Sequence, residues 1–196
     1  HYFGLNFNYA LLGLWDQSSY WGERMHVDKP DFLWTKIFSS NVPYWQGRYR
    51  ESLETWDKAL AEEGKPITEM GDTFALIYGD VQALAGDFGD AIRTLEPLIG
   101  PPRPFHYVEF GWVEFDAVHS LAWSYQETGL PEKGATILQS IDRQLEERKG
   151  LGLLHESRDL YMFARNAVLM GDSELALSRL EQAVTAGWRD YYVHLP

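Results

Sequence analysis

Residues 157–191 read SRDLYMFARNAVLMGDSELALSRLEQAVTAGWRDY, and this stretch decides the fold class. Apolar residues recur at helical spacing on both sides of Gly171 and Asp172, which predicts two amphipathic helices joined by a tight turn. Small residues stand where the two helices must touch, at Ala164 before the turn and Ala176 after it. The stretch therefore predicts an antiparallel helical hairpin.

The same plan recurs upstream around Gly47, Gly86 and Gly129, at intervals of about 40 residues. The residue seven positions before each turn glycine is small, as is the residue five positions after it, and a large apolar residue follows nine positions after it. The small pairs are Ser40 and Ser52, Gly79 and Ala91, Ala122 and Gly134, and Ala164 and Ala176. Since one hairpin cannot bury its own apolar face, we expect the hairpins to stack. With no stretch of strand periodicity, the class is all-α.

The hairpins divide the chain into predicted units. These are residues 31–66, 69–100, 113–149 and 157–187, in one continuous array over 31–196. Within the first unit, Pro43 should kink or end the outgoing helix, predicted over 31–46. Residues 1–30 are rich in aromatic side chains, and we expect them to cap the array with a helix near 5–16 and a shorter one before Asp28.

This pattern resembles the tetratricopeptide repeat family. The resemblance is closest at Ala164, Gly171, Ala176, Leu180 and Ala183, and it extends to Ala122, Tyr125, Gly129 and Leu138. It implies a right-handed superhelix of about four hairpins whose first helices line a concave face. The family's period is about 34 residues, shorter than the spacing here, so related repeats with longer helices remain an alternative. Residues 183–191 also resemble the last repeat of bacterial regulatory proteins that carry such a module beside a DNA-binding, kinase or cyclase domain.

Composition excludes several kinds of site. A formal net charge of -12 disfavours nucleic acid and anionic membranes as partners. The sequence has no cysteine, which excludes disulfides, zinc–cysteine sites and thiol catalysis but leaves both the cytoplasm and a bacterial periplasm open. No apolar run approaches the roughly 20 residues that span a bilayer. Because the sequence begins at His1 rather than Met, we expect it to be part of a longer or processed chain.

Motifs for catalysis are incomplete. His155 and Glu156 supply only the first half of a zinc-protease signature, and no glycine-rich phosphate loop is present. We therefore predict no metal, no cofactor and no enzymatic activity. The many carboxylates, such as Asp57 and Asp116, keep one alternative open: an enzyme or accessory domain that uses a pair of them as acid and base.

The resemblance places the binding surface on the first helix of each hairpin. The residues that it turns inward, and that we predict to bind a partner, are Trp34, Asn41, Tyr44, Trp45, Asp80, His119, Trp123, Gln126, Arg158, Tyr161 and Arg165. Aromatic side chains would supply contact area and polar groups would set register. The predicted function is a non-catalytic scaffold that binds a peptide or partner domain, including a second copy of the chain. The alternative is a ligand sensor in which Arg158 and Arg165, seven residues apart on one helix, clamp a small acidic ligand.

Overall fold

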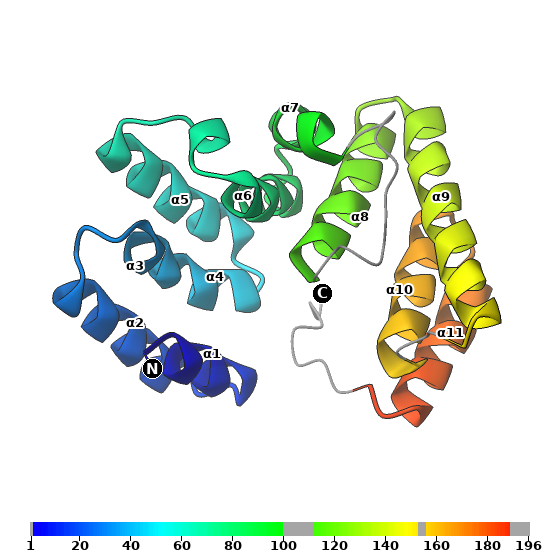
Figure 1. Cartoon of the computed structure of the whole chain (residues 1–196), viewed down its shortest axis with the longest axis horizontal. Coiled ribbons are helices and arrows are strands. Elements are labelled where there is room, and N and C mark those ends of the chain that lie inside the picture. The colour runs from blue at the N-terminus through cyan, green and yellow to red at the C-terminus, as the bar shows by residue number, and fades with distance from the viewer. Residues whose placement is uncertain (1, 100–111, 153–155, 189–196) are drawn as a thin grey trace. The chain divides into compact units, whose positions relative to one another are not determined.

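The computed structural model describes residues 2–99, 112–152 and 156–188, and the regular structure in these ranges is entirely helical (Figure 1). The all-α prediction is therefore confirmed. The chain divides into two compact units. One contains the described residues up to Phe74, and the other begins at Ala75. The predicted continuous superhelix stays a prediction.

The first unit consists of two helical hairpins. Its elements are α1 (Tyr2–Leu11), α2 (Trp15–Asp28), α3 (Leu33–Ile37), the 3-10 turn η1 (Phe38–Ser40), α4 (Asn41–Trp45) and α5 (Tyr49–Glu63), with a further 3-10 turn η2 (Ile67–Glu69). Helix α2 packs against α3. The predicted cap is a hairpin, but its first helix begins and ends earlier than 5–16, and its second is longer rather than shorter.

The first helix of the second hairpin is interrupted, as the presence of Pro43 predicted. The interruption lies before the proline rather than at it. Pro43 is within α4, and η1 interrupts the helix just upstream. Proline has no N–H to donate to the carbonyl of Ser39, and its ring crowds that carbonyl. The turn N-terminal to Pro43 therefore tightens into a 3-10 turn.

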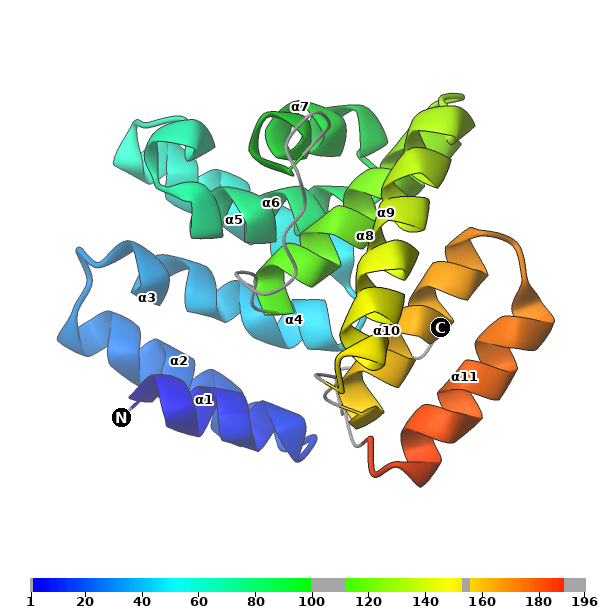
Figure 2. The same ribbon diagram turned by 45° about the vertical axis from the view of Figure 1, so that its right-hand side comes forward.

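The second unit contains the hairpins predicted around Gly86, Gly129 and Gly171. The boundary between the units falls in α6 (Asp72–Leu84), which is followed by α7 (Phe88–Ile99), α8 (Trp112–Glu127), α9 (Pro131–Gly150), α10 (Glu156–Leu169) and α11 (Ser173–Thr185). Figure 2 shows α8 and α9, and then α10 and α11, running antiparallel. Their core holds fully buried side chains such as Leu95, Leu121, Leu138 and Met162.

The turns between helices share one hydrogen-bond pattern that only glycine fits comfortably. At Gly171 the backbone is left-handed, with φ 82°, and the N–H of Asp172 donates to the carbonyl of Ala167 at 2.9 Å. This bond across the turn satisfies a carbonyl at the helix end. The same arrangement occurs at Gly129, where φ is 79° and Leu130 donates to Tyr125 at 2.8 Å.

The hairpin of α1 and α2 turns in the same way, at Gly13, with φ 68°. The small pair of the other hairpins is here a polar pair, Asn6 and Ser18, both buried. Asn6 Nδ2 donates to the Ser18 carbonyl at 2.8 Å, and Ser18 Oγ donates to the Asn6 carbonyl at 2.8 Å. Hydrogen bonds therefore hold these two helices at the contact where the other hairpins use small side chains.

Candidate partner-binding surfaces

Helices α8 and α10 carry most of the polar residues that the sequence assigns to a binding surface. Arg165 of α10 forms an ion pair with Asp116 of α8, and its guanidinium lies 5.9 Å from the centre of the Tyr161 ring. Burial opposes the charged form, but Asp116, with Tyr161 and Asp80, raises the pKa of Arg165. Arg165 is thus a permanent cation whose charge is already balanced by a neighbouring helix.

Two of the predicted residues lie in the interior of the second unit. Asp80 is buried and accepts a hydrogen bond from Ser120 Oγ at 2.6 Å. His119 is 2% exposed, and its Nε2 lies 3.1 Å from Asn166 Oδ1. In this structure both side chains join helices to one another.

Asn166 fixes the orientation of this buried contact. Its Nδ2 donates to the Leu138 carbonyl and to Asp142 Oδ1, each at 2.8 Å, so the amide oxygen is the atom left for His119. Because an amide oxygen only accepts, His119 carries its proton on Nε2. Asn166 thereby connects α8, α9 and α10.

The other two predicted residues of α8 make contacts within the second unit but keep some exposed surface. Trp123 packs edge-on against Phe88 with ring centres 5.0 Å apart, and its Nε1 donates to Glu127 at 3.1 Å. Gln126 donates to the Leu169 carbonyl at the end of α10, at 2.7 Å. Both residues are half-buried, so each retains area for a partner.

On α10, the other two predicted residues also have internal partners. Arg158 lies 3.4 Å from a carboxylate oxygen of the buried Asp159. Tyr161 stacks on Trp188, with ring centres 4.8 Å apart. The arginines of the predicted acidic-ligand clamp, Arg158 and Arg165, are therefore each beside a carboxylate of the protein.

The predicted aromatic residues of the first unit each contact another ring. Trp34 packs against Phe38 and Phe74, at ring distances of 5.7 and 4.2 Å. The pairs Tyr44 with Tyr49 and Trp45 with Phe7 lie 5.8 and 5.7 Å apart. Asn41, like these three predicted aromatics, is half-buried. A single groove that joins them to α8 and α10 remains a prediction.

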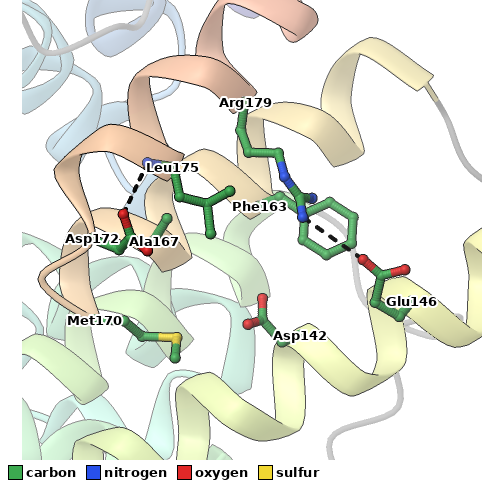
Figure 3. Close-up of a pocket in the computed structure, with 8 residues that line it drawn as sticks. All are labelled: Asp142, Glu146, Phe163, Ala167, Met170, Asp172, Leu175 and Arg179. Carbon is green, nitrogen blue, oxygen red and sulfur yellow. Dashed lines mark hydrogen bonds and ion pairs between the residues drawn. The ribbon is translucent and has the colours of Figure 1, made fainter.

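A small pocket lies on a different surface, between the return helices α9 and α11 and over α10 (Figure 3). Its volume is about 130 Å³. We call it the acidic groove; its lining residues are Asp142, Glu146, Phe163, Ala167, Met170, Asp172, Leu175 and Arg179. Three carboxylates therefore face one guanidinium among these residues. Arg179 lies 4.3 Å from the centre of the Phe163 ring and 3.8 Å from Glu146.

Sequence reasoning missed the acidic groove because it followed the first helix of each hairpin. Large apolar side chains surround the groove in exposed positions: Met170 is 49% exposed and Leu175 is 42% exposed. Met170 lies in the turn after α10 and Leu175 lies in the first turn of α11, so neither belongs to the buried core. Asp142 and Glu146, four residues apart, lie on one face of α9. In the sequence, the signals for the groove were the apolar residues beside the Gly171 turn and the carboxylates four residues apart on α9.

The described residues show no group of three or more His, Cys, Asp or Glu side chains arranged to hold a metal ion. Within the same ranges, no helix combines the length and the apolar character needed to cross a membrane.

Comparisons with known proteins add little to these observations. No family model matches the chain, and no curated protein matches it. Among solved structures, a chain described as MamA MSR-1 C2 aligns with 94% of this chain and 94% of its own length, at 15% identity and a TM-score of 0.48.

Proposed function

We propose that the protein is a non-catalytic scaffold of the tetratricopeptide type that binds a peptide or a domain of another protein. The observation that carries this proposal is the exposure of large apolar side chains on its last helical hairpin. Val168 on α10, Met170 in the turn that follows it, and Leu175, Leu177 and Val184 on α11 are all exposed. Several exposed large apolar side chains on one hairpin favour a protein–protein contact.

The size of the acidic groove supports the same proposal. Sites for small molecules usually enclose about 300–1,000 Å³, whereas this groove measures about 130 Å³. A space of that size suits one side chain of a partner. The sensor alternative has less support, because an acidic ligand would compete with Asp116 for Arg165 and with Asp159 for Arg158.

We also propose that the half-buried residues of α8 and α10 contribute to partner binding. Trp123, Gln126, Tyr161 and Arg165 retain exposed surface, whereas the buried Asp80 and His119 would support that surface from below. Aromatic and arginine side chains are the types that most often dominate binding energy.

The test is competitive capture by the immobilised chain from an extract of its source organism, with quantitative mass spectrometry. A scaffold should retain a defined protein that excess soluble chain displaces. The double variant Trp123→Ala with Arg165→Ala should lose that protein. The control Tyr20→Ala with Arg93→Ala, which removes one aromatic and one arginine side chain from exposed positions, should keep it. Circular dichroism should show every variant folded. Recovery that soluble chain cannot compete would overturn the scaffold, and unchanged recovery by a folded Trp123/Arg165 variant would overturn this surface.

A further inference from the structure

The acidic groove combines an apolar floor with a negative rim. Phe163 and Ala167 are buried beneath it, and Met170 and Leu175 stand exposed beside it. Methionine is flexible and polarizable, so it adapts to different apolar partners. A side chain of leucine or methionine size would therefore find a complementary surface.

The carboxylates of the rim have capacity for a cation. Asp142 Oδ1 accepts from Asn166, and Asp172 Oδ1 accepts from the N–H of Leu175 at 2.9 Å. Among the described residues, the Oδ2 atoms of Asp142 and Asp172 accept no hydrogen bond. Figure 3 shows the Asp142 carboxylate pointing into the space between Met170, Leu175 and Phe163. Both residues can thus accept from a partner without losing their internal bonds.

Glu146 has only loose partners. It lies 3.8 Å from Arg179 and 3.7 Å from Lys149, and its side chain is half-exposed. Exposed ion pairs of this length contribute little to stability, so a cation from a partner can replace them at small cost. Arg179, stacked on Phe163, would remain in place as part of the floor.

We propose that the acidic groove binds a basic amphipathic segment of a partner protein. One apolar side chain enters beside Met170 and Leu175, and neighbouring lysine or arginine side chains pair with Asp142, Glu146 and Asp172. A metal ion fits less well, because these carboxylates do not form a metal-ligating group. The net charge of -12 would also attract a basic segment over long range. This inference rests on the proposed scaffold function and assigns it a surface and a partner chemistry.

The probe is a fluorescein-labelled peptide of about 14 residues, built from leucine and lysine at helical spacing, with a leucine–glutamate counterpart. Fluorescence anisotropy measures its binding to the full chain. The wild type should bind the lysine peptide and not the glutamate peptide. Equal binding of both peptides, or no binding of the lysine peptide, would overturn the proposal.

Matched variants separate the groove from general attraction to an acidic protein. Asp142→Asn with Glu146→Gln should weaken binding about tenfold, a change of about 1.4 kcal/mol. Glu174→Gln with Glu181→Gln alters the net charge equally but removes exposed carboxylates of α11 that do not line the groove, and should change affinity less than about twofold. Equal weakening by the two charge variants contradicts a specific site.

A second pair of variants tests the apolar floor. Met170→Ser with Leu175→Ser should weaken binding about tenfold, whereas Leu177→Ser with Val184→Ser, at exposed α11 positions outside the groove, should leave it nearly unchanged. All of these variants except Asp142→Asn alter exposed positions, and thermal unfolding should confirm that each variant is folded. If competitive capture succeeds and the groove variants still bind the peptide normally, the scaffold stands and only the groove assignment fails.

Discussion

At the scale of single residues, the contact between the helices of a hairpin depends on the absence of side-chain atoms. A Cβ atom built on Gly134 would lie 2.7 Å from the backbone carbonyl oxygen of Ala122 on α8. On Gly79 it would collide with the side chain of Leu95. Backbone cannot move aside as a flexible side chain can, so Gly134 is the more restrictive position.

Gly134→Ala should therefore destabilise the protein, although alanine favours a helix over glycine by about 1 kcal/mol. We expect a loss of about 1–3 kcal/mol, because α8 and α9 must separate. Gly89→Ala is the matched control, since the nearest atom to its Cβ, Arg93 Nη1, is 3.8 Å away, and it should be neutral or stabilising. Urea unfolding of the two variants measures the difference; equal stability would show that the hairpin tolerates the extra methyl group.

Glu96 makes a pH-dependent contribution to the free energy of unfolding. Its pKa is lowered by the Tyr125 hydroxyl and by Lys133 Nζ, which donates to it at 3.0 Å. The Tyr125 hydroxyl has no partner in hydrogen-bond geometry among the described residues, so it acts on Glu96 as a nearby polar group. Because the folded pKa lies below the unfolded value of about 4.3, the stabilisation is present above that pH and is lost as pH falls through the folded pKa.

We therefore expect Glu96→Gln to lower stability at pH 7 by less than about 1 kcal/mol, since Glu96 is partly exposed and screened by solvent. The difference from wild type should shrink between pH 7 and an acid pH below the folded pKa of Glu96. Urea unfolding at the two pH values measures it, with Glu181→Gln correcting for the loss of one negative charge. A difference that persists in acid would assign the effect to packing rather than ionisation.

At the scale of helices, local signals in the sequence predict most elements well. Glycine turns and helical apolar spacing locate α7 to α11 because each signal acts within a few residues. The α1–α2 hairpin was missed as a repeat because Asn6 and Ser18 replace a small pair with a hydrogen-bonded pair. The pairing of Arg165 with Asp116 joins residues far apart in sequence, so spacing could not reveal that the predicted anion clamp has an internal partner.

Asn166 shows how helices from different hairpins are held in register. Asn166→Ala removes its bonds to Leu138, Asp142 and His119 in a fully buried position. Leaving these groups unpaired should destabilise the protein by about 2–4 kcal/mol, measured by urea unfolding.

Asn166→Asp keeps the shape of the side chain but replaces the donor with an oxygen facing Asp142, so it should be destabilising at pH 7 and partly recover as pH falls. His26→Ala, at an exposed position, is the control and should have little effect. An Asn166→Asp variant as stable as wild type at pH 7 would show that the amide donor has no structural role.

At the scale of the whole molecule, the excess of 29 acidic over 17 basic residues acts on stability and on binding in opposite directions. Repulsion among negative charges weakens the folded state, whereas the same charges attract a basic segment. Raising salt from about 0.01 M to about 0.15 M shortens the Debye length from about 30 Å to about 8 Å, which screens both effects. We therefore expect Tm to rise over this titration while affinity for the leucine–lysine peptide falls.

Differential scanning fluorimetry and anisotropy on the same samples measure the two trends. Glu174→Gln with Glu181→Gln should raise Tm at low salt and reduce its salt dependence, because the variant carries less negative charge. A fall of Tm with salt would mean that ion pairs such as Lys36 with Glu63, at 2.6 Å, outweigh the net repulsion. If affinity for the peptide did not change with salt, apolar contact with Met170 and Leu175 alone would drive binding, and the carboxylates of the acidic groove would not select a basic partner.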